Sequence, residues 1–371
     1  MKILYVTSKT FNPEISTCGG GVINNRNYRL LCALGNIEVA VNFLKPSKPT
    51  KIRLLELFRK TGRVFLTKIP LAFYSREVRQ LKKIIAYKKW DVIFFDNSVV
   101  GGLARTAKES GACVITFFHN VEFNYYRNVG KILRYRARRV KKCEYESIKH
   151  SDILIVLNER DKKELSDIYD KNDKFTDKIR IVPATVKDRF NPNENNTDPD
   201  MGKSGHVGLF LGSFFPPNYN GVKWFVKRVA PYLNCNIKIA GSGFESVRAK
   251  LERKNVEVIG SIEDTKQICL QADFIVSPIF EGEGMKVKTA ESLMYGKTIF
   301  GTTESWEGYD ADYEKAGGLC NTAEEFIAAI NNGVANNTIK RYNEYSRNIY
   351  LAKYSDDVAL KEFAKIFGEI K

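Results

Sequence analysis

The sequence predicts an α/β protein made of two domains, each built around a parallel β-sheet. At 371 residues, with 43% hydrophobic content, the chain is long enough for two cores. Short apolar runs alternate with helix-like segments, which is typical of parallel strands covered by helices on both faces. A polar, turn-rich stretch at residues 191–200 divides this alternation into two series.

The first series predicts an N-terminal domain over residues 1–188, followed by a linker over residues 189–206. A glycine loop, Gly19 to Gly21, follows the first strand, and a helix is expected from Val22 to Leu34, ending at Gly35. The expected strands are Ile3–Thr7, Val39–Phe43, Val92–Phe95, Cys113–Phe118, Ile153–Leu157 and Ile179–Val182.

The second series predicts a C-terminal domain over residues 207–354. The expected strands are Val207–Leu211, Ile237–Ala240, Val256–Ile259, Phe274–Val276 and Thr298–Gly301. Gly296 ends one helix, and the residues from Thr322 to Glu325 form a capping box that opens another. The last segment, residues 355–371, has one apolar helical stripe and is expected to pack back on the first domain.

Positive charge is concentrated in the N-terminal half. The net charge is +16. The region from Lys45 to Lys89 carries +12, that from Arg127 to Lys142 carries +8, and the rest of the chain sums to −4. The segment from Lys131 to Lys142 combines apolar residues at partly helical spacing with arginines, and can lie on anionic lipid. A solvated basic face is the alternative. No nucleic-acid motif is apparent, so no nucleic-acid partner is expected.

The same observations predict where the protein acts. The apolar N-terminus is too short for a signal peptide, and no apolar run has membrane-spanning length. We therefore expect a cytoplasmic protein that associates peripherally with the inner face of the cytoplasmic membrane.

The most informative stretch runs from Phe280 to Glu291, between a predicted strand and a predicted helix. Two glycines allow close approach of a ligand to the backbone, and the helix start and two lysines attract an anion, which predicts a phosphate site. Glu283 and Glu291 stand beside it as hydrogen-bond acceptors, and sugar hydroxyls are natural donors to them.

This stretch resembles the Glu-x7-Glu signature of retaining glycosyltransferases of family 4, the glycosyl transferases group 1, which have the GT-B fold. The stretch from Leu209 to Phe225 is similar to the start of the C-terminal domain in one subgroup, and His119-Asn120-Val121-Glu122 is a supporting match. The resemblance implies two Rossmann-like domains that face a central cleft, the first binding the acceptor and the second binding the nucleotide sugar.

The resemblance also implies roles for individual residues. It implies that Glu283 contacts hydroxyl groups of the donor sugar and that Glu291 binds the ribose of the nucleotide. The remaining donor-binding residues that we predict in this domain are Gly212, Ser213, Gly284, Met285 and Lys286. The predicted catalytic residues are Glu283 and Lys288, together with His119 of the first domain. Many family members carry an Arg and a Lys where this chain has Phe214 and Asn220, and Lys286 and Lys288 could replace that charge. A solvated loop lysine is the alternative for each of them. We prefer Lys288 to Lys286 as the catalytic one.

Two further candidates lie in the N-terminal half. His119 ends a predicted buried strand, and the resemblance places it near the reacting carbon, in contact with the donor sugar; a purely structural histidine is the alternative. Gly20 and Gly21 belong to a loop that approaches donor phosphate or acceptor in GT-B enzymes, although a plain tight turn would use the same residues. The Gly-x-Gly-x-x-Gly fingerprint of dinucleotide-binding loops is absent there, which argues against a dehydrogenase.

No cofactor and no metal are expected. The Asp-x-Asp sequences at Asp310 and Asp198 lie in a turn and in the linker, and a lysine-rich pocket reduces the need for a cation. The predicted function is retaining transfer of a sugar from a nucleotide diphosphate sugar to a saccharide or lipid-linked acceptor, in bacterial surface polysaccharide synthesis. A nucleotide-sugar epimerase, a retaining glycosidase and a non-catalytic polyanion- or membrane-binding protein are the alternatives.

Overall fold

The computed structural model describes residues 1–8, 19–35, 37–43, 75–128, 130–170, 175–192 and 205–370. Contacts divide the chain into two compact units. The first unit comprises residues 1–16, 23–183 and 359–371, and the second comprises residues 17–22 and 184–358.

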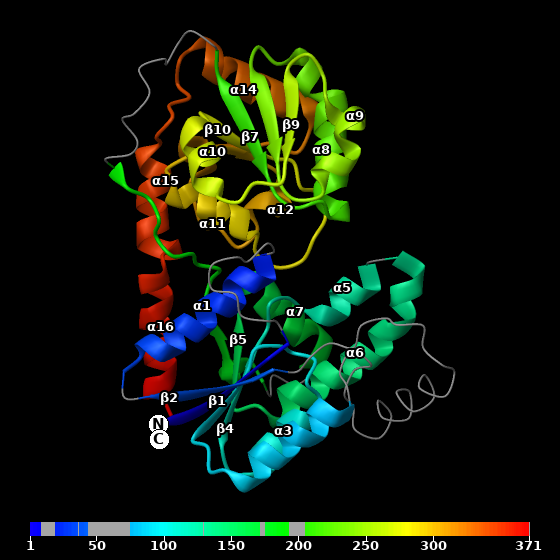
Figure 1. Ribbon diagram of the computed structural model, residues 1–371, viewed down its shortest axis with the longest axis vertical. Coiled ribbons are helices and arrows are strands. Elements are labelled where there is room, and N and C mark those ends of the chain that lie inside the picture. The colour runs from blue at the N-terminus through cyan, green and yellow to red at the C-terminus, as the bar shows by residue number, and fades with distance from the viewer. Residues whose placement is uncertain are drawn as a thin grey trace. The chain divides into compact units, whose positions relative to one another are not determined.

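The first unit contains a sheet of parallel strands with helices on both faces (Figure 1). Its strands are β1 (Lys2–Thr7), β2 (Glu38–Phe43), β3 (Val92–Phe95), β4 (Cys113–Phe117), β5 (Ile153–Val156) and β6 (Ile179–Ile181). The order across the described sheet is β2-β1-β3-β4-β5-β6.

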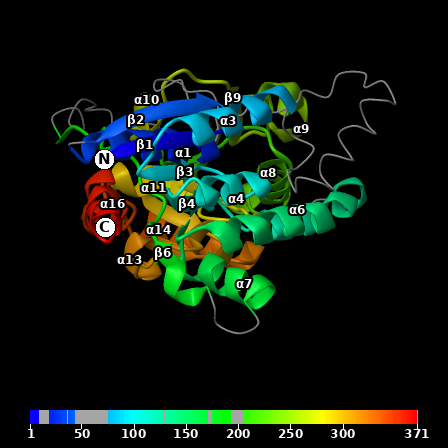
Figure 2. The ribbon, with the colours of Figure 1, turned by 90° about the horizontal axis from the view of Figure 1, so that it is seen from below.

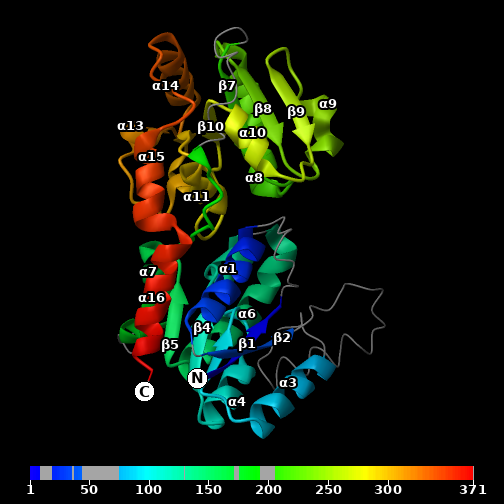
Figure 3. The same ribbon diagram turned by 60° about the vertical axis from the view of Figure 1, so that its left-hand side comes forward.

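The helices of this unit form its covering layers. They are α1 (Gly19–Ala33), α3 (Ser75–Tyr87), α4 (Gly102–Glu109), α5 (Glu122–Asn128), α6 (Gly130–His150), α7 (Glu159–Tyr169) and α16 (Asp356–Gly368), with the short 3₁₀ turn η1 (Thr176–Lys178). α3, α4 and α6 are neighbours (Figure 2). α16 (red in Figure 3) joins this unit from the far end of the chain, where Phe363 stacks on Phe94 with ring centroids 6.1 Å apart.

The second unit repeats the architecture. Its strands are β7 (Val207–Leu211), β8 (Asn236–Ala240), β9 (Val256–Gly260), β10 (Phe274–Ser277), β11 (Thr298–Gly301) and β12 (Gly317–Leu319). All the described pairings are parallel, in the order β12-β11-β10-β7-β8-β9.

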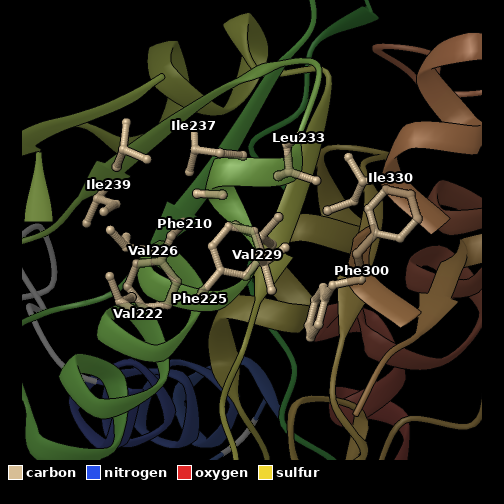
Figure 4. Packing of buried hydrophobic residues seen from close by; sticks show 14 of the residues in the cluster. Phe210, Val222, Phe225, Val226, Val229, Leu233, Ile237, Ile239, Phe300 and Ile330 are labelled. Atoms are coloured by element: carbon tan, nitrogen blue, oxygen red, sulfur yellow. The ribbon is translucent and has the colours of Figure 1, made fainter. Parts of the chain in front are cut away.

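The helices around the second sheet are mostly short. They are α8 (Pro216–Arg228), α9 (Arg248–Leu251), α10 (Thr265–Gln271), α11 (Val287–Met294), α12 (Thr303–Trp306), α13 (Tyr313–Ala316), α14 (Ala323–Ala335) and α15 (Glu344–Ile349), with the 3₁₀ turns η3 (Ala230–Tyr232) and η4 (Phe244–Val247) and a π-helical turn η5 (Tyr350–Tyr354). Phe225 of α8 packs with Phe210 of β7 and Ile237 of β8 in a core of buried apolar side chains (Figure 4).

The structure confirms the predicted α/β architecture. Every predicted strand is present, with ends that differ by at most one residue, and Thr322 and Glu325 form the predicted capping box. β12 was not predicted because it contains two glycines and no apolar run. Glycine is required there: a Cβ on Gly317 would lie 2.4 Å from the Ile299 carbonyl oxygen.

Two predicted segments differ from the structure. α1 begins at Gly19, so Gly20 and Gly21 belong to its first helical turn and not to a loop before it, because the helical hydrogen bonds begin three residues earlier than the apolar pattern suggests. Residues 189–192 of the predicted linker belong to the second unit, where the Arg189 N–H donates to the Met294 sulfur at 3.3 Å. Residues 193–204 lie outside the described residues.

Each sheet has a point where the direction of strand addition reverses. In the first sheet it lies between β1 and β3, and in the second between β7 and β10. The carboxyl ends of the strands at such a point diverge and leave a crevice, which is where open α/β sheets bind ligands. The topology therefore assigns one candidate site to each unit.

Candidate active site

The crevice of the second sheet is formed by the loops that follow β7 and β10. Gly221 of α8 allows these two segments to approach, since a Cβ there would lie 1.8 Å from the Pro278 carbonyl oxygen. Gly241, after β8, has the same role toward the first loop, because its Cβ would lie 2.0 Å from the Gly212 carbonyl oxygen. Glycines at these positions bring three strand ends together at backbone distance.

Lys288, in the first turn of α11, directs its ammonium group to the end of β7. Its Nζ donates to Asn218 Oδ1 at 2.8 Å and lies 4.5 Å from the centroid of the Phe210 ring. Asn218 Nδ2 in turn donates to the Ser213 carbonyl oxygen at 2.8 Å. A Cβ on Gly212 would lie 2.8 Å from Lys288 Nζ, so glycine leaves the space that the ammonium group needs.

The charge on Lys288 is only partly compensated by its surroundings. Burial and the neighbouring Lys286 lower the pKa of Lys288 to about 7, and Glu291 opposes them. Within the described residues, no carboxylate forms an ion pair with Lys288 Nζ. An anionic ligand would supply the missing negative charge.

Lys286 is engaged differently. Its Nζ contacts Glu304 Oε1 at 2.5 Å and donates to the Gly284 carbonyl oxygen at 2.8 Å, and its side chain is largely buried. The Glu304 carboxylate therefore neutralises this lysine inside the protein. Among the described residues, Lys288 therefore differs from Lys286 in having no carboxylate in an ion pair with its Nζ. That Lys288 is the lysine that meets a phosphate stays a prediction.

Glu291 lies three residues beyond Lys288 on α11. Its Oε1 is 3.5 Å from Arg189 Nη2, and its side chain is 21% exposed. Burial raises the pKa of Glu291, although Arg189 and Lys288 oppose the increase. Glu283 lies partly exposed on the loop between β10 and α11.

The start of α11 is shaped by the residues around it. Gly284 adopts a φ of +64°, which favours glycine, and the Met285 side chain is buried with its sulfur accepting the Ala184 N–H at 3.3 Å. The Thr289 N–H donates to the Lys286 carbonyl and the Ala290 N–H to Tyr309 Oη. An anion at this helix start would therefore meet the N–H groups of Val287 and Lys288, which precede them.

His119 belongs to the first unit, where it follows β4. Its Nε2 lies 3.4 Å from Asp96 Oδ1 and 3.3 Å from the Asp96 carbonyl oxygen. The ring packs edge-on against Phe117 with centroids 5.0 Å apart. The second unit brings together Gly212, Ser213, Gly284, Lys286, Lys288 and Glu291, whereas His119 is part of a separate polar cluster.

Sequence reasoning missed several partners of the predicted residues. Asn218, Arg189, Glu304 and Asp96 each contact one of them, but all four are ordinary polar residues in the sequence. Only Asp96 carries a local signal, since it directly follows the apolar strand β3 and so stands at a carboxyl strand end.

Acidic residues do not gather into a metal site in the described part of the chain. Asp310 pairs with Lys353 at 2.6 Å and Asp312 with Lys315 at 3.1 Å, and the pair at Asp198 lies outside the described residues. Metal-independent chemistry stays a prediction.

The basic surface is only partly described. Most of the region from Lys45 to Lys89 lies outside the described residues. On α6, Arg136, Arg138 and Lys142 are exposed. None of the helices in the described ranges combines the length and apolar character needed to cross a bilayer.

Comparison with known proteins adds to this geometry. Residues 205–336 match the family described as Glycosyl transferases group 1. Sucrose-phosphate synthase from Thermosynechococcus elongatus is similar in structure, with a TM-score of 0.73, 13% identity, and coverage of 100% of this chain and 99% of that one. No curated protein matches the sequence.

Two further solved structures are similar over almost their whole length. WaaG, a glycosyltransferase involved in lipopolysaccharide biosynthesis, has a TM-score of 0.69 and 13% identity, with 99% of this chain and 100% of that one covered. HepE of Anabaena, in complex with UDP-glucose, has a TM-score of 0.65 and 12% identity, with 99% of both chains covered. These likenesses show the GT-B fold.

Proposed function

We propose that this GT-B glycosyltransferase, with its group 1 domain at residues 205–336, transfers a sugar from a nucleoside diphosphate sugar with retention of anomeric configuration. The acceptor is a saccharide or a lipid-linked saccharide. One observation carries the proposal: Lys288 Nζ is held at the end of β7, at the switch point of the sheet, without a carboxylate partner among the described residues. A diphosphate fits both that position and that charge.

The chemistry follows from where charge develops. As the bond from the sugar C1 to the diphosphate breaks, negative charge grows on the leaving phosphate. Lys288 and the first N–H groups of α11 stabilise the transition state, in which this charge has grown, more strongly than they stabilise the ground state. The activation barrier is therefore lowered. The acceptor attacks from the same face, and its proton passes to the leaving phosphate oxygen, so the step requires no protein base.

The carboxylates supply recognition of hydroxyl groups. Glu291 is placed beside Lys288 on the same helix, where it can accept hydrogen bonds from the vicinal hydroxyls of a ribose. Glu283, on the loop before the helix, is assigned to the hydroxyls of the sugar. HepE was crystallised with UDP-glucose, which supports uridine diphosphate sugars as the first donors to test.

The biological setting is proposed on the same basis. WaaG acts in lipopolysaccharide biosynthesis, and the exposed arginines of α6 suit an anionic surface. We assign this enzyme to bacterial surface polysaccharide synthesis at the inner face of the cytoplasmic membrane. Co-sedimentation with anionic vesicles, lost at high salt and absent with neutral vesicles, is the expected result; equal binding to both would contradict it.

A donor screen tests the proposed reaction. Thermal shift with UDP-, GDP-, ADP- and CDP-sugars is expected to show saturable stabilisation by one nucleotide class, followed by acceptor-dependent release of the nucleotide and an α-linked product from an α-linked donor. Conversion of the donor without acceptor would indicate an epimerase, and hydrolysis of a nitrophenyl glycoside a glycosidase. Salt-sensitive polyanion binding without saturable nucleotide-sugar binding would indicate a non-catalytic protein.

A further inference from the structure

A buried polar cluster occupies the switch point of the first sheet. Thr7 ends β1 and Asp96 follows β3, the two strands between which the order reverses. Asn24 of α1 joins them, because its Nδ2 lies within hydrogen-bonding distance of Thr7 Oγ1 and of Asp96 Oδ2. These three side chains are at most 2% exposed, so the cluster is fixed by the core of the unit.

Asp96 is held as a carboxylate. Three N–H groups donate to its two oxygens, from Asn24, Asn27 and His119, and each of these contacts favours the ionised form. Burial by itself raises the pKa of Asp96, but His119 and the two amides outweigh burial and hold the pKa below its usual value.

A chain of hydrogen bonds orients this carboxylate. Buried Arg26 donates from Nε and Nη2 to Asn27 Oδ1, at 3.1 and 2.7 Å. With its oxygen thus engaged, Asn27 must direct its Nδ2 to Asp96 Oδ1, which it reaches at 2.7 Å. The guanidinium of Arg26 is itself placed over Phe117 at 5.6 Å. Asp96 therefore has no freedom to turn away from His119.

The contacts of His119 determine which ring nitrogen carries the proton. Nε2 faces two acceptors of the same residue, the Asp96 carboxylate and the Asp96 carbonyl. Only an Nε2–H group satisfies both. Nδ1 is buried and has no hydrogen-bond partner among the described residues, so in the neutral ring it is an unused acceptor.

We infer that Asp96 is a positioning residue of the transferase: it fixes His119 in the Nε2–H form and thereby presents Nδ1 as an acceptor for a hydroxyl group of a sugar substrate. This inference rests on the proposed function for the identity of the substrate. The sugar hydroxyl would satisfy the orphaned nitrogen, and the carboxylate behind the ring would stabilise any positive charge that the imidazole acquires.

The tautomer itself can be measured without any substrate. The chain has three histidines, His119, His150 and His206, so a long-range ¹H–¹⁵N spectrum of the full-length protein at pH 8.5 contains few signals, and His119→Gln identifies the one of interest. We expect the Nε2–H form for His119 in the wild-type protein. An Nδ1–H signal would overturn the inference, even if the protein transfers sugars.

Kinetics then separate positioning from a structural role. Asp96→Asn replaces one acceptor oxygen by a donor, so we expect a mixture of tautomers and a kcat about tenfold lower with a UDP-sugar that the wild-type enzyme uses. In a His119→Gln background the same change should cause no further loss, because the two residues act as a unit. Losses that multiply in the double variant would overturn the inference.

Asp152→Asn provides the matched control. The Asp152 carboxylate also accepts hydrogen bonds, one of them from the Val114 backbone N–H at 2.9 Å, but it lies at the amino end of β4, the strand that His119 follows. This variant should lower the melting temperature while the His119 tautomer and kcat stay at wild-type values. The same change of tautomer in Asp152→Asn would mean that general loosening moves the ring, which contradicts positioning by Asp96. A wild-type protein that consumes no nucleotide sugar would reject the proposed function instead.

Discussion

The switch points of the two sheets share a topology but differ in what fills them. At the second sheet, Gly212 and Gly241 have no side chain to fill the space after the strands. Lys288 directs its ammonium group to the end of β7, and no described carboxylate forms an ion pair with it. At the first sheet, Asp96 and its amide partners fill the space with buried side chains, and its charge is satisfied internally.

The difference shows how one architecture provides two kinds of recognition. A parallel sheet with a reversal of strand order offers a crevice wherever it occurs. Whether that crevice binds an anion depends on whether the protein leaves positive charge for the ligand to neutralise. The second unit does so, and we assign it the diphosphate. The first compensates its own charge and leaves His119 Nδ1 among its unpaired acceptors in the described residues, which suits a hydroxyl group.

Removing the uncompensated charge should have the largest effect. We expect Lys288→Ala to lower kcat by roughly 10² or more, because a preorganised positive charge at the leaving phosphate is lost. Lys286→Ala is the control and should have a smaller effect, since its Nζ is already paired with Glu304. Steady-state kinetics with the donor found in the screen measures both. Equal losses would mean that the internal ion pair does not distinguish the two lysines, and an unchanged rate in Lys288→Ala would remove that lysine from the mechanism.

Glu291→Gln should weaken nucleotide binding about tenfold with a smaller change in kcat, because a neutral amide accepts a ribose hydrogen bond less strongly than a carboxylate. Calorimetry with the free nucleotide measures this directly. His119→Gln should leave the affinity for the free nucleotide unchanged, since its cluster provides no charge for phosphate. An unaltered affinity in Glu291→Gln would reject the ribose assignment.

Donor affinity should fall as the pH rises through 7. Lys288 has a pKa lowered to about 7, so above that pH the free enzyme loses the proton that the bound diphosphate requires, and binding must take one up. With Lys286 and Glu291 as the charged neighbours, a single proton predicts roughly fivefold weaker binding at pH 8 than at pH 7. Calorimetry in buffers of different ionisation enthalpy should show proton uptake at pH 8, and uptake that persists in Lys288→Ala would assign the proton to another group.

Much of the fold could be predicted because it depends on local patterns. Continuous apolar runs specify strands buried on both faces, and the end of one run at Phe95 places Asp96 at a carboxyl strand end without further information. β12 could not be found in this way, since it forms by backbone pairing with β11 and has no apolar pattern. The first turn of α1 was missed because three glycines carry no helical pattern.

The sequence by itself determined the two-domain parallel architecture and the loop with two lysines and two glutamates, because both are written in short, contiguous stretches. Only the tertiary structure decided that Glu304 neutralises Lys286, that Asn218 holds Lys288, and that Asp96 fixes the ring of His119. These pairs are between 18 and 70 residues apart in the chain. The chemistry of these residues depends on which charges have a partner of opposite sign nearby. That depends on distances between residues far apart in the chain, which a local sequence pattern does not specify.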